Sequence, residues 1–104
     1  MPNYEVSFKA EEDIDRFRRY LIRENGLKVS EEFVNSIYEL FDFIAQYPNV
    51  AKSKKDIDDG AFSYPHVKYK RVVLFKHTDD GITIVRVLGG RQDQSRHVSD
   101  DDFV

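Results

Sequence analysis

The sequence predicts an α+β domain, in which an N-terminal helical hairpin packs on an antiparallel sheet. Three observations predict this class. A short N-terminal stretch alternates apolar and polar residues. Two longer stretches then repeat apolar residues at every third or fourth position, and two stretches rich in β-branched residues follow. The predicted element order is therefore β-α-α-β-β-β.

The composition indicates one folded domain. At 104 residues the chain is long enough to bury a single core. Charged residues make up 34% and aromatic residues 13%, which suits a compact domain rather than a disordered chain. The chain contains no cysteine, so disulfides and thiolate metal sites are excluded. We expect the domain to span residues 1–98 and residues 99–104 to form an acidic, flexible tail.

The sequence shows no sign of membrane targeting. No stretch approaches the roughly 18 consecutive apolar residues of a membrane-spanning helix. The N-terminal Met-Pro-Asn-Tyr-Glu lacks the basic and then apolar segments of a secretory signal. We therefore expect a cytoplasmic protein without a membrane partner.

The first quarter of the chain predicts a strand and then a helix. Tyr4, Val6 and Phe8 alternate with polar residues, which indicates a half-buried strand. From Ala10 to Glu24 the apolar residues have helical spacing. Acids crowd the first turn and arginines follow, an order that complements the helix dipole. Asn25-Gly26 is a typical C-terminal stop signal.

A second helix is predicted from Glu31 to Gln46, where apolar residues form a broad stripe. Ser30 is the expected N-cap, and Pro48 prevents much continuation. A link of four or five residues between the helices implies that they run antiparallel. Residues 49–60 are polar and indicate a loop. The aromatic residues expected in the core from their period are Tyr4, Phe8, Phe17, Phe33, Phe41 and Phe75.

The second half of the chain predicts three strands. A short strand near Ala61–Tyr64 is expected to break at Pro65. Two apolar strands rich in β-branched and aromatic residues follow at Tyr69–His77 and Ile82–Leu88. Asp80-Gly81 between them is typical of a tight hairpin turn with positive φ angles.

This predicted hairpin carries much positive charge for so apolar a unit. No acid lies between Lys68 and Asp79. Such a surface suits an anionic partner, either nucleic acid or an acidic protein. A net charge of −3 argues against strong binding to RNA, which usually rests on a basic domain. The cations within or just after the hairpin are Lys68, Lys70, Arg71, Lys76, Arg86 and Arg91.

Other polar residues have simpler interpretations. The arginines of the first helix form its polar face. His66 and His77, with Asp79 and Asp80, lack the spacing of a metal site. We expect neither a metal nor another cofactor.

The stretch Ile84-Val-Arg-Val-Leu-Gly-Gly-Arg-Gln-Asp93 is the most specific motif of the chain. It is similar to the ending Ile-x-Arg-Val-Leu-His-Gly-Arg-x-Asp of ParE toxins. Together with the opening Tyr4-Glu-Val-Ser-Phe8 and the pair Asp13-Ile14, it makes the chain resemble the RelE/ParE superfamily of type II toxin–antitoxin modules. The chain departs from its relatives in Gly89, where many have His, and in its acidic total. It also has no clear counterpart of an arginine on the strand before the hairpin.

The resemblance to ParE implies a toxin that poisons DNA gyrase without catalysing a reaction. It implies a cognate antitoxin as partner, and a role of the kind found in plasmid stabilisation. The residues implied for binding the antitoxin or the target are Lys68, Lys70, Arg71, Arg86 and Arg91.

Two other hypotheses remain open at this point. RelE-type relatives cleave mRNA on the ribosome, which needs a base for the 2′-hydroxyl proton and cations for the developing charge. A third hypothesis is a non-toxic binding domain that kept the fold and lost the site. The acidic total favours the ParE hypothesis. The catalytic candidates under the RelE hypothesis are Arg71, Arg86, Arg91 and His97, with Lys68 and Lys70 as further cations.

Overall fold

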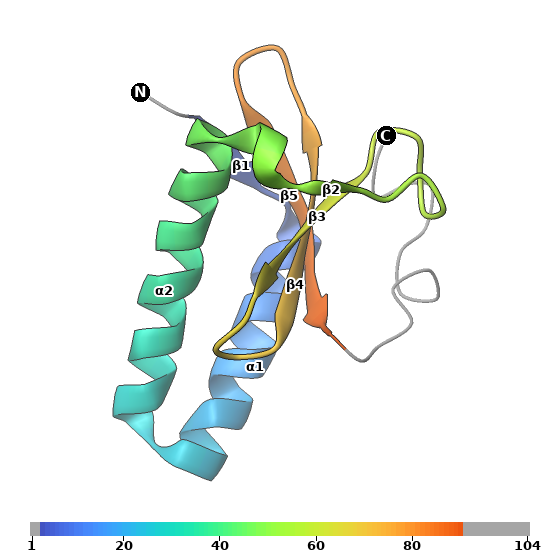
Figure 1. Ribbon diagram of the computed structural model, residues 1–104. Helices are drawn as coiled ribbons and strands as arrows, with labels where there is room; N and C mark the ends of the chain where they lie inside the picture. The colour runs from blue at the N-terminus through green and yellow to red at the C-terminus, as the bar shows by residue number, and fades with distance from the viewer. Residues whose placement is uncertain (1–2, 91–104) are drawn as a thin grey trace.

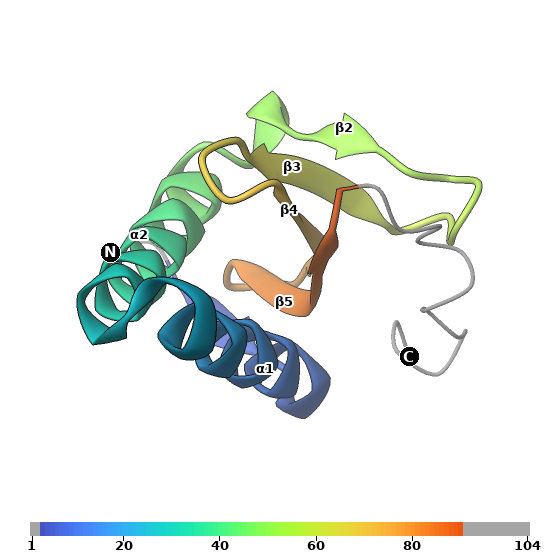
Figure 2. The ribbon, with the colours of Figure 1, turned by 90° about the horizontal axis from the view of Figure 1, so that it is seen from below.

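The computed structural model describes residues 3–90 (Figure 1). The two helices lie side by side on one face of the sheet, which confirms the predicted α+β class (Figures 1 and 2). Within residues 3–90 no helix is both long enough and apolar enough to cross a bilayer. The expected boundary at residue 98 lies outside the described residues. The elements are β1 (Tyr4–Val6), α1 (Phe8–Asn25), α2 (Leu27–Gln46), the 3-10 helix η1 (Pro48–Val50), β2 (Lys52–Ser53), β3 (Phe62–His66), β4 (Arg71–His77) and β5 (Ile82–Gly89).

The sheet is mixed rather than antiparallel throughout. Its strand order is β1-β5-β4-β3-β2, and β1 pairs parallel with β5 while the other pairs are antiparallel. The prediction of a purely antiparallel sheet was therefore wrong for β1. Parallel pairing requires a long crossover connection, and the elements between Val6 and Ile82 provide it. The short strand β2 lies in the segment predicted as a loop.

The first helix begins two residues earlier than predicted because Ser7 caps it. The Ser7 hydroxyl accepts a 3.0 Å hydrogen bond from the backbone N–H of Ala10. The strand period thus ends at Val6, and Phe8 becomes the first residue of α1, with 75% of its surface exposed. The prediction that Phe8 belongs to the core was wrong for this reason.

The two helices are joined by Gly26 alone, not by the predicted four or five residues. Gly26 has φ 94° and ψ 169°, a backbone conformation that is open almost only to glycine. Ser30 is therefore not the N-cap of α2. It is buried inside the helix, and its hydroxyl donates to the carbonyl of Leu27 at 2.7 Å.

The core fills the space between the helices and the sheet. Three predicted aromatic residues, Phe33, Phe41 and Phe75, are fully buried there. Tyr4 and Phe17 are half-buried at its border. The buried residues of this cluster are Ala10, Ile14, Leu21, Phe33, Ile37, Phe41, Ile44, Val73, Phe75, Ile82, Ile84 and Val87.

Strands β3 and β4 differ at their ends from the prediction. Strand β3 continues through Pro65, because β2 pairs with β3 only at Phe62 and Ser63 and Pro65 lies beyond that pairing. A proline is tolerated where no neighbouring strand needs its missing N–H. Strand β4 starts at Arg71 rather than Tyr69, since the preceding residues form a turn in which Lys70 has φ 53°.

The turn between β4 and β5 does not use positive φ angles, so that prediction was wrong. Among residues 3–90 only Gly26 and Lys70 have positive φ. The N–H of Thr78 donates to the carbonyl of Gly81 at 2.9 Å, and the N–H of Gly81 donates to the Thr78 hydroxyl at 3.1 Å. Glycine is required here for space, because a Cβ at Gly81 would overlap the backbone carbonyl of Asn3.

Candidate functional site

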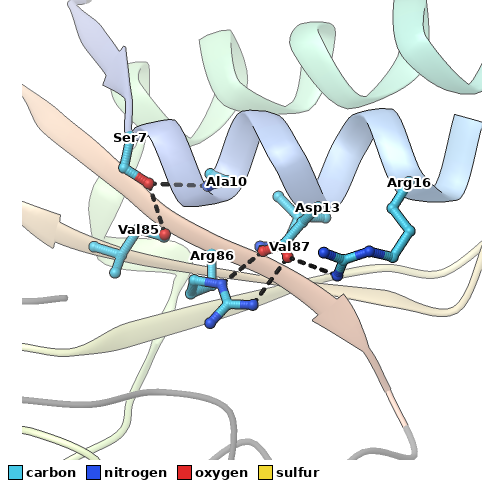
Figure 3. Close-up of polar contacts among 7 residues, drawn as sticks. All are labelled: Ser7, Ala10, Asp13, Arg16, Val85, Arg86 and Val87. Atoms are coloured by element: carbon cyan, nitrogen blue, oxygen red, sulfur yellow. Dashed lines mark hydrogen bonds and ion pairs between the residues drawn. The ribbon is translucent and has the colours of Figure 1, made fainter.

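Helix α1 continues along the edge of β5 that β1 leaves uncovered. Ser7 is the only residue between β1 and α1, so the helix runs on in the direction of the strand. The Ser7 N–H donates to the carbonyl of Ile84 at 2.9 Å, and its hydroxyl donates to that of Val85 at 2.8 Å. Further along β5, the N–H of Val87 donates to Asp13 Oδ2 at 3.0 Å (Figure 3). Ser7 and the α1 side chain of Asp13 thus make hydrogen bonds to β5 that a neighbouring strand would otherwise make.

The Asp13 carboxylate also holds the guanidinium of Arg86. Arg86 Nε lies 2.8 Å from Asp13 Oδ2, and Arg86 Nη2 lies 2.9 Å from Asp13 Oδ1 (Figure 3). This is the bidentate geometry that arginine favours with carboxylates. The Asp13 side chain is 4% exposed and that of Arg86 12%. Arg16, which is largely exposed, adds a longer ion pair to Asp13 at 3.8 Å.

Arg71 has a different environment. Its guanidinium lies over the Phe17 ring, with 4.1 Å between the guanidinium carbon and the ring centroid. Its Nε–H donates to the carbonyl of Tyr69 at 3.3 Å. Among residues 3–90 no acceptor lies within hydrogen-bond distance of its two Nη atoms. The Arg71 side chain is half-buried, and this burial lowers its pKa from the ordinary value.

Arg71 and Arg86 border the same open depression, which has a volume of about 360 Å³. It lies between α1 and the adjoining ends of β4 and β5. A second depression adjoins it and is lined by Phe17, Tyr20, Tyr69, Lys70 and Arg71. The surface is therefore cationic and aromatic, and suits an anion beside an apolar group. The residues that line the first depression are Asp13, Arg16, Phe17, Tyr20, Arg23, Arg71, Arg86, Val87 and Leu88.

The other predicted cations lie apart from this depression or outside the described residues. Lys68 is exposed in the turn between β3 and β4, and it borders a different depression beside α2. Lys70, in the same turn, borders the second depression next to Arg71. Arg91 and His97 lie outside the described residues.

The two described histidines are far apart and do not form a site together. His66 is at the end of β3 that pairs with Arg71, whereas His77 is at the opposite end of β4. No group of three potential metal ligands occurs within residues 3–90.

His66 is instead part of a buried polar cluster. Its Nε2 lies 2.9 Å from the hydroxyl of Ser36, which donates to the carbonyl of Phe33 at 2.8 Å. Because that hydroxyl has one proton, Nε2 carries the ring proton and Nδ1 is an acceptor. Nδ1 and the nearby Tyr69 hydroxyl are buried and have no hydrogen-bond partner in the described part of the chain. Burial lowers the pKa of the His66 imidazole, with Lys68 as a smaller cause.

The sequence predicted Arg71 as a site residue but indicated no site role for Asp13, Phe17 or Tyr20. In the sequence Asp13 belongs to the pair Asp13-Ile14, and Phe17 has the period of a core residue. A usable signal was present, because residues three or four apart share one helix face. Asp13, Phe17 and Tyr20 have this spacing, as do Arg16 and Tyr20.

Comparison with known families identifies the class of this protein. Residues 4–94 match the family described as the ParE toxin of the type II toxin–antitoxin system parDE. The chain therefore belongs to the ParE toxin family, which confirms the resemblance seen in the sequence.

Individual relatives agree with this assignment. The chain is 27% identical over 79 residues to Toxin ParE3 of Caulobacter vibrioides, covering 76% of this chain and 77% of that one. Its fold is similar to a solved structure titled "Chromosomal ParDE TA system from P. aeruginosa", with a TM-score of 0.74 and 18% identity. That similarity covers 86% of this chain and 96% of the other.

Proposed function

We propose that this chain poisons DNA gyrase in the cytoplasm without catalysing a reaction, and that a cognate antitoxin holds it inactive. The observation that carries the proposal is the match to the ParE toxin family over residues 4–94. The proposed action requires no metal or other cofactor.

The chemistry of the depression supports a binding function. A nuclease of RelE type needs a group that accepts the 2′-hydroxyl proton near neutral pH. The only carboxylate in the lining, Asp13, already accepts hydrogen bonds from Arg86 and Val87. The arginines of the lining stay protonated and cannot act as bases. The described lining holds no histidine, so the candidate base under the RelE alternative is His97, which with Arg91 lies outside the described residues.

The predicted contact residues have different roles in this proposal. Arg71 and Lys70 border the depressions, and we assign to them contact with the antitoxin or the target. Lys68 and Arg91 stay in the predicted set of contact residues. Arg86 shapes the site through its ion pair with Asp13.

Parallel assays of gyrase and of mRNA cleavage test the proposal. Purified chain, shown to be folded by circular dichroism, should inhibit gyrase supercoiling and trap cleaved DNA. The same preparation should leave transcripts intact in a translation mixture. Intact gyrase activity with cleaved transcripts, abolished by His97→Ala, would establish the RelE alternative. If neither assay responds and overexpression does not arrest growth, the chain is a binding domain without toxicity.

A further inference from the structure

We infer that the depression between α1 and the ends of β4 and β5 binds an acidic segment of the antitoxin. Arg71 receives a carboxylate of that segment, while Phe17 and Tyr20 receive a neighbouring apolar side chain. The inference rests on the proposed function in one respect, namely that the segment belongs to an antitoxin. The chemistry of the segment follows from the site itself.

The first argument is the hydrogen-bonding capacity that the Arg71 guanidinium leaves unused within residues 3–90. A guanidinium has five N–H donors in a planar fork. Arg71 makes one hydrogen bond of 3.3 Å, to the carbonyl of Tyr69, and its Nη atoms have no acceptor within residues 3–90. The contact with the Phe17 ring holds the guanidinium at the border of the depression. A half-buried fork of this kind is suited to a bidentate carboxylate.

The second argument is the contrast with Arg86. Arg86 borders the same depression, but Asp13 binds its guanidinium through two hydrogen bonds. Asp13 also accepts the N–H of Val87, and within residues 3–90 it makes no hydrogen bond to Arg71, on which it acts only through its charge. Of the two strand arginines, Arg71 is therefore the one that an incoming carboxylate reaches.

The third argument is that the surroundings favour an acidic peptide over a nucleic acid. The depression of about 360 Å³ is of the size that takes a few side chains. Phe17, Tyr20 and Leu88 give it apolar walls, and the exposed Arg16 and Arg23 add positive charge at its border. A nucleic acid backbone instead requires an extended basic track, and the chain has a net charge of −3.

A peptide titration followed by NMR tests this site. The probe is the N-acetylated, C-amidated tetrapeptide Asp-Leu-Asp-Phe, and the matched control peptide is Asn-Leu-Asn-Phe. The acidic peptide should shift the backbone amide signals around Phe17 and Tyr20, and the neutral peptide should not. Arg71→Ala should weaken the affinity about 10-fold to 100-fold, the range for a hydrogen-bonded charged pair. Arg71→Lys should lose part of the affinity for the acidic peptide, because lysine lacks the planar fork of donors.

Two controls make the result decisive. Lys52→Ala removes an exposed cation on β2 and should leave the affinity unchanged. The melting temperature of Arg71→Ala should stay near that of the unaltered chain, so that lost binding reflects the site. With the antitoxin co-expressed, Arg71→Ala should weaken the complex while Lys52→Ala does not.

Three results would overturn the inference. Undiminished peptide binding to Arg71→Ala would show that Arg71 is not the anchor. Amide shifts confined to another surface would place the site elsewhere, and tighter binding of a single-stranded RNA oligomer to the depression would favour nucleic acid. If the chain inhibits gyrase but binds no acidic peptide, this inference is refuted and the proposed function is not. Peptide binding as described, with gyrase unaffected, refutes only the proposed target.

Discussion

Asp13 is the residue at which the fold and the candidate site depend on each other. Its carboxylate is almost fully buried and accepts hydrogen bonds from the Arg86 guanidinium and from the N–H of Val87. A buried charge is tolerated only when it is paired and hydrogen-bonded. Asp13 therefore attaches α1 to β5, and at the same time it determines which arginine remains open to a partner.

Replacing Asp13 tests this dependence. Asp13→Ala leaves the Arg86 guanidinium and the Val87 N–H without their acceptor, and should lower the free energy of unfolding by about 3–5 kcal/mol. Asp13→Asn should cost less, because its amide oxygen still accepts from Val87. Urea denaturation measures both. Asp15→Ala is the control, since Asp15 pairs with Arg18 and Arg19 in solvent and its loss should have little effect. Equal effects at both positions would contradict the structural role of Asp13.

His66 makes stability depend on pH in a defined direction. Burial lowers the pKa of its imidazole below the ordinary value of 6.5. As the pH falls through about 6.5, the unfolded chain takes up a proton that the folded chain does not. Stability contributed by the neutral ring should thus be lost at up to about 1.4 kcal/mol per pH unit, until the pH falls below the folded pKa. Denaturation midpoints between pH 7.5 and 5 measure this slope.

Two variants separate His66 from the other titrating groups. His66→Gln can still donate to Ser36 but does not titrate, so the slope should decrease. His77→Gln changes an exposed histidine at the far end of β4 and should keep the slope. An unchanged slope in His66→Gln would show that other groups cause it.

The sequence pattern pointed to Arg71 and Arg86 equally, and only the tertiary structure distinguishes them. The two arginines have similar positions on apolar strands. Their difference arises from Asp13, which is 73 residues away from Arg86 in the chain. No local pattern reports a pair at that separation, so the cationic surface was predictable but the availability of each cation was not.

At the scale of elements, the sequence predicted both helices and the last two strands to within a few residues. These elements have strong periodic patterns of apolar residues. The errors concern short features that have no periodic pattern, a one-residue link and a two-residue strand. Gly26, part of the predicted stop signal Asn25-Gly26, is the whole link between the helices. Strand β2 was missed because its two residues are defined by pairing with β3 and have no period of their own.

Gly81 tests how β1 is attached. A Cβ at this position would overlap the carbonyl of Asn3, just before β1. Gly81→Ala should lower the free energy of unfolding by about 1–3 kcal/mol, the usual cost of overpacking. It should also speed hydrogen exchange of the β1 amides. Gly60→Ala is the matched control, because its Cβ would lie 3.7 Å from Asp58 Oδ1, an ordinary contact. Equal loss of stability in both variants would contradict this account.

At the scale of the whole molecule, β5 connects the N-terminal elements to the rest of the sheet. It lies between β1 and β4 in the sheet, and it supplies the hydrogen-bond partners of Ser7 and Asp13. The N-terminal strand and α1 therefore reach their final contacts only after β5 is present. Contacts of such large sequence separation are costly to form and make folding depend on the complete domain.

Removing β5 should therefore unfold the whole domain rather than only shorten the sheet. A chain that ends after His77 leaves β1 without a partner strand and the Asp13 carboxylate without its donors, the Arg86 guanidinium and the Val87 N–H. We expect such a chain to show no cooperative thermal transition and a poorly dispersed NMR spectrum, whereas the full chain shows both a transition and good dispersion. A cooperative transition in the shortened chain would contradict this prediction.

The way α1 covers β5 also bears on self-association. Unpaired strand edges are templates on which other chains add strands and aggregate. Here Ser7 and Asp13 occupy backbone groups of β5 where β1 has ended. At the opposite border β2 has only two residues, and Pro65 removes a donor from the part of β3 beyond it. The edge strands β1 and β2 have only three and two residues, so the described sheet offers little continuous backbone for strand addition.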